Sequence, residues 1–146
     1  MTITGRTAAT GQGSDLKEGR DMQDPSSEYA DTCRTALAAE QASSLAETDG
    51  WSHIDRQQVH SDWDLLYRAL AAMPDESEAA SPAVQEMMAR HYAIASRFYV
   101  PSKDAYIGMS LFYNENLEMR TFHNEYGPDF VVFLSEAMQV FAQRNL

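Results

Sequence analysis

The 146-residue sequence has one cysteine, Cys33, so it can form no intramolecular disulfide and no cysteine-based zinc site. It also lacks a long hydrophobic run. The longest purely apolar stretches, 69–73 and 130–134, have five residues each, whereas a membrane span needs about 20. Its first residues lack the apolar segment of a secretory signal. Together these absences predict a soluble protein of the cytoplasm, where thiols stay reduced.

Basic residues are scarce. Eleven Lys and Arg stand against 22 Asp and Glu, which gives a net charge of −11. The basic residues are scattered along the chain, whereas neutralising a phosphate backbone needs Lys and Arg in clusters. An acidic surface repels DNA and anionic membranes. We therefore expect no direct binding to nucleic acid and no association with membranes.

Motifs of common catalytic and cofactor sites are missing as well. The sequence contains no nucleophile motif, no phosphate-binding loop and no dinucleotide fingerprint. Its four histidines, at positions 53, 60, 91 and 123, show no metal-ligand spacing. His91 falls on the apolar face of its predicted helix, where a satisfied core or pocket histidine is the simpler interpretation than a catalytic one. We expect no enzyme activity, no cofactor and no metal.

Composition divides the chain into three parts. Residues 1–25 hold four of the seven glycines and no aromatic residue, which predicts a disordered tail. Residues 26–59 predict a weakly ordered, lid-like segment: a helix over 26–47 with mostly small apolar side chains, followed by a turn at Asp49 and Gly50. Residues 60–146 predict the main helical domain.

Apolar residues recur at helical spacing throughout the third part. Ser61, Ser81 and Ser102 are placed to cap helices, and Pro82 suits a first helical position. Pro101 predicts a helix end. No segment alternates with a period of two, so we predict an all-α fold of five or six helices. Beyond 26–47, the expected helices are 62–73, 82–99, 103–114, 117–125 and 129–143.

Four tyrosines, at positions 92, 99, 106 and 113, recur at intervals of seven residues. Seven residues make two helical turns, so Tyr92 and Tyr99 would share one helical face, and Tyr106 and Tyr113 would share a face of the next helix. The rings could serve helix–helix packing, which is the usual role of aromatic stripes. Alternatively, they could line an apolar ligand groove that offers several hydroxyl donors.

The same region resembles the TipAS antibiotic-recognition domain. The family pattern is a histidine about seven residues before Phe-Tyr, then a proline, a tyrosine, Gly-Leu and a later tyrosine. Here those positions are His91, Phe98, Tyr99, Pro101, Tyr106, Gly108, Met109 and Tyr113. The beginning at Ser81 and Pro82 and the last predicted helix also match, so the resemblance spans about residues 60–146. The family's Asp-x-Arg-Phe is replaced at 116–119, and no cysteine beside the proline offers covalent capture.

The resemblance implies a globin-like helical arrangement around a cleft for bulky, often peptide-derived antibiotics. Such domains occur as the drug-binding half of MerR-type regulators and as stand-alone proteins that sequester a drug. We interpret this chain as a stand-alone monomer in which residues 26–54 close on the ligand and become ordered. The candidate ligand-binding residues are Trp63, Tyr67, His91, Tyr92, Phe98, Tyr99, Tyr106, Met109 and Tyr113.

Two other classes of function stay open at this point. A protein-interaction module would take a partner helix into the same groove. An enzyme or haem protein would depend on His91 or His123. A protein partner without small-molecule affinity would favour the first alternative, and a Soret band or turnover lost on His91→Ala would favour the second.

Overall fold

A computed structural model describes residues 26–146; the tail predicted at 1–25 lies outside this range. The described part contains helices and no strand, which confirms the all-α prediction. The six helices of the described part are α1 (Ser27–Glu47), α2 (Arg56–Ala71), α3 (Pro82–Ala95), α4 (Lys103–Glu115), α5 (Leu117–Asn124) and α6 (Phe130–Asn145).

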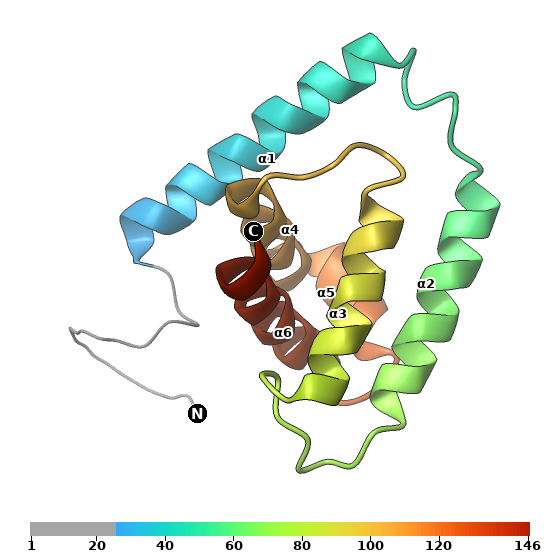
Figure 1. The fold of residues 1–146 in the computed structure, drawn as a ribbon, viewed down its shortest axis with the longest axis vertical. Coiled ribbons are helices and arrows are strands. Elements are labelled where there is room, and N and C mark those ends of the chain that lie inside the picture. The colour runs from blue at the N-terminus through green and yellow to red at the C-terminus, as the bar shows by residue number, and fades with distance from the viewer. Residues whose placement is uncertain (1–25) are drawn as a thin grey trace.

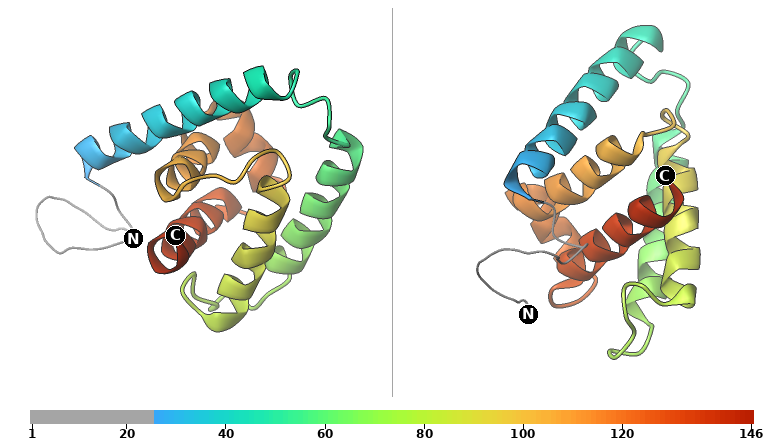
Figure 2. Two further views of the ribbon diagram at one scale, coloured as in Figure 1. Left: turned by 45° about the horizontal axis from the view of Figure 1, so that its top comes forward. Right: turned by 60° about the vertical axis from the view of Figure 1, so that its left-hand side comes forward.

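The helices surround a central pair, α4 and α6 (Figure 1). α4 packs on α1, α5 and α6, while α3 packs on α2 and α6. α1 and α2 form an outer arc around these helices, and the views of Figure 2 show α1 lying along α4. The globin-like arrangement itself stays a prediction.

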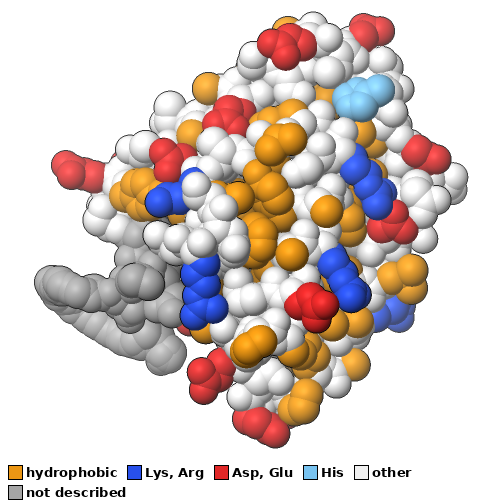
Figure 3. Space-filling model, in the orientation of Figure 1, with side chains coloured by type: hydrophobic (Ala, Val, Ile, Leu, Met, Phe, Trp, Pro, Cys, Tyr) orange, Lys and Arg blue, Asp and Glu red, His pale blue; other side chains and the backbone are white. Residues whose placement is uncertain are grey.

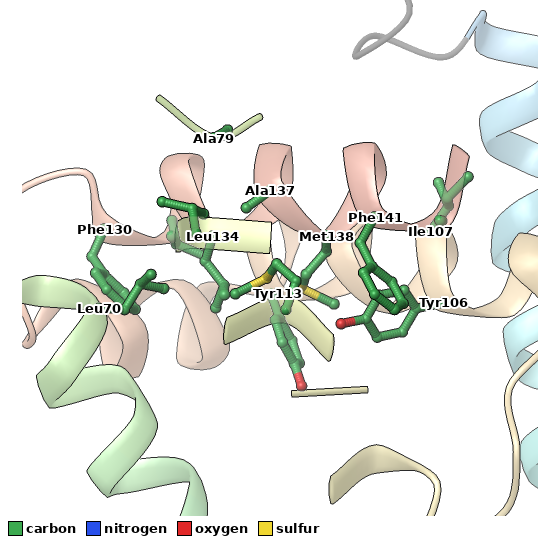
Figure 4. Close-up of a cluster of buried hydrophobic side chains, with 14 of the residues drawn as sticks. Leu70, Ala79, Tyr106, Ile107, Tyr113, Phe130, Leu134, Ala137, Met138 and Phe141 are labelled. Atoms are coloured by element: carbon green, nitrogen blue, oxygen red, sulfur yellow. The ribbon is translucent and has the colours of Figure 1, made fainter. Parts of the chain in front are cut away.

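The core lies between these helices and is rich in aromatic rings (Figure 4). α6 contributes the stripe that its sequence predicts, with Phe130, Leu134 and Met138 all buried. Tyr106 and Tyr113 of α4 enter the same core.

Helix α1 docks on α4 through mostly small side chains and one leucine. Its buried residues are Ala30, Cys33, Leu37 and Ser44. Gly108 of α4 permits the close approach, because a Cβ there would lie 2.3 Å from the Cys33 carbonyl oxygen. The predicted helix over 26–47, which needs a surface to pack on, finds it on α4.

The predicted caps hold at two helices and fail at a third. As expected, the Ser81 hydroxyl accepts the backbone N–H of Val84 in α3, and the Ser102 hydroxyl accepts that of Ala105 in α4. Ser61 caps nothing, because α2 begins five residues before it, at Arg56. The cap of α2 is Asp55, whose carboxylate accepts the N–H of Gln58 at 3.1 Å.

This difference predicts unequal effects of two substitutions. We expect Asp55→Ala to lower the free energy of unfolding by about 1 kcal/mol, because the Gln58 N–H loses its partner. Ser61→Ala, at an exposed position inside α2, should change it by less than about 0.5 kcal/mol. Urea denaturation of both variants tests this, and equal losses would contradict the assignment of the cap.

The predicted end of α3 is also corrected. The helix ends at Ala95 rather than near Tyr99. The N–H groups of Arg97 and Phe98 turn to carbonyls three residues back, which tightens the chain before Pro101. The Tyr92 hydroxyl then donates to the Pro101 carbonyl and fastens the loop back onto α3. Tyr92 and Tyr99 consequently do not share a helical face.

Candidate functional site

Burial divides the predicted ligand-binding residues into two groups. Tyr67, His91, Tyr106 and Tyr113 are buried in the core. The half-buried group is Trp63, Tyr92, Phe98, Tyr99 and Met109. Only the second group offers surface to a ligand in this arrangement, and the first group supports it from behind.

Hydrogen bonds connect the buried group into a chain. His91 meets the Tyr106 hydroxyl through Nδ1 at 2.8 Å and the Tyr67 hydroxyl through Nε2 at 3.1 Å. The Tyr67 hydroxyl also meets His123 Nε2 at 3.3 Å. His123 Nδ1 lies 2.7 Å from the carbonyl oxygen of Met119. The chain thus crosses from α4 through α3 and α2 to α5.

Burial keeps both histidines of this chain neutral. It lowers the pKa of His91 to about 3, and the nearby His123 adds to the effect. Burial lowers the pKa of His123 as well, although the Met119 carbonyl opposes the shift. Each ring therefore has one N–H and one acceptor nitrogen at neutral pH.

Neutral rings give the chain a single direction. A carbonyl can only accept, so His123 Nδ1 donates to Met119 and its Nε2 accepts the Tyr67 proton. His91 Nε2 must then donate to the Tyr67 oxygen. Its Nδ1 accepts from the Tyr106 hydroxyl. Every group in the chain is satisfied, so His91 is a fully partnered core histidine.

A row of rings runs from His91 toward the surface. Trp63 stacks on His91 with ring centroids 5.4 Å apart and on Phe98 at 6.3 Å. Trp51 meets the Phe98 ring edge-on at 5.0 Å. We call Trp51, Phe98, Trp63 and His91 the aromatic row. It brings together the turn after α1, the loop after α3, helix α2 and helix α3.

Trp51 was not among the predicted ligand-binding residues. It lies in a tight turn in which Asp49, Gly50 and Trp51 all have positive φ, of 55°, 67° and 63°. The Asp-Gly pair indicates a turn, but only the fold shows that the turn brings Trp51 onto Phe98.

Two half-buried side chains, one in the row and one that follows Phe98 in sequence, have polar atoms without a hydrogen-bond partner within residues 26–146. These buried atoms are Trp63 Nε1 and the Tyr99 hydroxyl oxygen. Burial and the charge of Glu40 raise the pKa of Tyr99 to about 12, so its hydroxyl keeps its proton. An unsatisfied buried donor costs about 1–3 kcal/mol, which a bound acceptor would recover.

Helix α1 reaches this region through polar side chains. Glu40 accepts the backbone N–H of Ser102 at 3.1 Å and its hydroxyl at 2.5 Å. The Tyr29 hydroxyl donates to Asp104 at 2.7 Å. These contacts join α1 to the first turn of α4, beside the loop that carries Phe98 and Tyr99.

Hydrophobic side chains gather on the molecular face between α1 and α3, with charged side chains around them (Figure 3). Two pockets of the described residues lie elsewhere, against α2, α5 and α6, with volumes of about 550 and 640 Å³. None of the nine predicted ligand-binding residues lines either pocket.

No group of three or more His, Cys, Asp or Glu within residues 26–146 could hold a metal ion. No helix of that range is long and apolar enough to cross a membrane.

Comparison with known proteins gives one match. The family model described as the TipAS antibiotic-recognition domain matches residues 23–141. It therefore includes α1 and all but the last five residues of the region where the sequence resemblance was found. No curated protein and no solved structure matches the chain.

Proposed function

Because the chain belongs to the TipAS antibiotic-recognition domain family, we propose that it binds a bulky hydrophobic antibiotic or natural product at the aromatic row. The binding is non-enzymatic and serves drug sensing or resistance in the cytoplasm. The observation that carries this proposal is the stack of Phe98, Trp63 and His91, with Trp63 Nε1 buried and unpartnered. Such a stack offers a ligand ring faces and a donor at the same place.

The half-buried residues divide the work of binding. Trp51, Trp63 and Phe98 stack on rings of the ligand, while Trp63 Nε1 and the Tyr99 hydroxyl donate to its carbonyl groups. Tyr92 holds the loop that carries Phe98 and Tyr99 through its bond to Pro101. Met109, half-buried on α4, adapts its flexible side chain to the ligand's outline.

The buried residues fix the position of Trp63. His91 cannot turn without breaking its bonds to Tyr67 and Tyr106, and Trp63 stacks on that fixed ring. A rigid platform of this kind reduces the entropy lost on binding. Tyr113, stacked on His123 at 4.4 Å, supports the far end of the hydrogen-bonded chain.

Helix α1 closes over the ligand in this proposal. In the described structure α1 packs chiefly on α4. Its movement would break this one interface, while α2, α3, α5 and α6 keep their packing on one another. Its movement would carry Trp51 and Glu40 relative to the loop that holds Phe98. Ligand-induced ordering of α1 would produce a large negative heat-capacity change.

Tryptophan fluorescence tests the proposal, because Trp51 and Trp63 belong to the aromatic row. We expect one compound in a panel of hydrophobic antibiotics, thiopeptides included, to quench the emission saturably. Phe98→Ala should weaken its Kd at least tenfold, since a stacking face is lost. Phe112→Ala, at an exposed ring on α4, is the matched control and should stay within twofold.

Two results would contradict the proposal. One is equal weakening by Phe98→Ala and Phe112→Ala. The other is a folded protein that no compound in the panel quenches or stabilises, which would favour a partner helix as the occupant of this surface.

A further inference from the structure

A pocket of about 550 Å³ lies away from the aromatic row and is formed by the end of α2, the segment after it, the α5–α6 loop and the start of α6. Pockets for small molecules in proteins commonly have volumes of 300–1,000 Å³. Its apolar lining includes Leu70, Met73 and Phe133. Tyr126 and Phe130 add two rings with centroids 5.5 Å apart and planes tilted by 41°. This lining suits a ligand with an apolar body.

The charge of the lining is negative. Asp75 and Asp129 both line the pocket, and neither carboxylate has a hydrogen bond or an ion pair within residues 26–146. No lining residue is Lys or Arg. Glu136 also lines the pocket but has an interaction of its own, so the charge balance rests on the two aspartates.

Neighbouring Asp64 differs from Asp75 and Asp129 because its carboxylate has hydrogen-bond partners. It accepts from Arg68 at 2.8 Å and from the Tyr126 hydroxyl at 2.6 Å, and these bonds lower its pKa. Asp64 fixes the Tyr126 ring at the pocket and is itself occupied. Asp75 and Asp129, both exposed, are pocket carboxylates without a partner within residues 26–146.

Asp129 stands at the cap position of α6, but its carboxylate does not cap the helix. Its backbone has φ of 58°, in the left-handed region. Asn124 supplies the capping instead, because its side-chain oxygen accepts the Val131 N–H at 2.9 Å. Aspartate is one of the few residues other than glycine that adopt the left-handed conformation readily.

The sign of the ligand follows from these charges. The N-terminus of α6 contributes about half a positive charge. Two unpaired carboxylates outweigh it, so the pocket favours a cation. The faces of Tyr126 and Phe130 attract cations through their ring quadrupoles. We propose that this pocket binds an organic cation with an apolar body.

Calorimetry with two ions of the same shape tests the charge. Tetraphenylphosphonium is the cationic probe and tetraphenylborate is its anionic counterpart. We expect the full chain to bind the phosphonium at low salt and to bind the borate at least tenfold more weakly. Raising the salt to about 0.5 M should weaken phosphonium binding several-fold.

Two double variants distinguish attraction of the cation by the pocket carboxylates from attraction by the net negative charge of the protein. Asp75→Asn with Asp129→Asn should weaken phosphonium binding about tenfold or more, and asparagine tolerates the left-handed conformation at 129. Glu86→Gln with Glu118→Gln removes two exposed charges outside the pocket and should stay within twofold. Both double variants carry the same net charge, and thermal melts show that each is folded.

Aromatic NMR signals give the location directly, since those of Tyr126 and Phe130 should shift as the phosphonium binds. Equal affinity for the borate, no binding of the phosphonium, or equal weakening in the two double variants would overturn the proposal. Phe98→Ala should leave phosphonium affinity unchanged, so the outcome here is independent of the outcome at the aromatic row.

Discussion

Replacing Gly108 with alanine will detach α1 from α4. The new Cβ would lie 2.3 Å from the Cys33 carbonyl oxygen and 2.9 Å from its carbon. Both atoms belong to the backbone of α1, so no side-chain rotation relieves the clash and the helices must separate. Overpacking of this kind costs about 1–3 kcal/mol. That exceeds the gain in helix propensity from glycine to alanine, which is at most about 1 kcal/mol.

Hydrogen exchange is the measurement that shows where this loss falls. Amides of α1 should exchange faster in Gly108→Ala while those of α6 keep their protection, because α1 packs chiefly on α4. Gly127→Ala is the control, since a Cβ at 127 meets nothing within 4 Å. Unchanged protection of α1 in Gly108→Ala would show that the contact is looser than the structure describes.

The second large effect concerns acid. Between the pKa of about 3 that His91 has when folded and about 6.5 when unfolded, the unfolded chain binds the extra proton. The contribution of His91 to stability is therefore complete above about pH 6.5 and is lost as the pH falls toward 3. His123, whose pKa is also lowered, adds in the same direction. Each histidine contributes a slope of up to about 1.4 kcal/mol per pH unit.

Urea denaturation between pH 6.5 and 5 measures this slope before most carboxylates are protonated. His91→Gln removes one titrating group, so its slope should be clearly smaller than that of the wild type, whatever its absolute stability. His60→Gln, exposed on α2, is the matched control, because it removes a histidine outside the core. The same slope in all three proteins would show that the buried histidines do not bind protons on unfolding.

The local features of the fold could be predicted, because their causes lie close together in the sequence. Ser81 with Pro82 and Ser102 after Pro101 mark helix beginnings through bonds that span three residues. The beginning of α2 was missed because Asp55 and Ser61 are equally acceptable caps in sequence, and packing of Val59 into the core favours the longer helix.

Only part of the geometry around the predicted site residues could be predicted from the sequence. The seven-residue spacing correctly places Tyr106 and Tyr113 together in the core. It misplaces Tyr99, because α3 ends at Ala95 and Tyr99 lies in the loop that the Tyr92–Pro101 hydrogen bond holds against α3. Contacts such as Trp63 on His91 join residues 28 positions apart, and no local pattern specifies them.

In the hydrogen-bonded chain of the core, a backbone group sets the order of donors and acceptors. Its last acceptor is the carbonyl of residue 119, which every amino acid at that position would also possess. Substitution of Met119 thus cannot reverse the order of donors and acceptors that leads to Tyr106. Side chains around these hydrogen-bonded groups can therefore be replaced without changing the tautomer of His91. That tautomer is set by the peptide carbonyl four residues before His123.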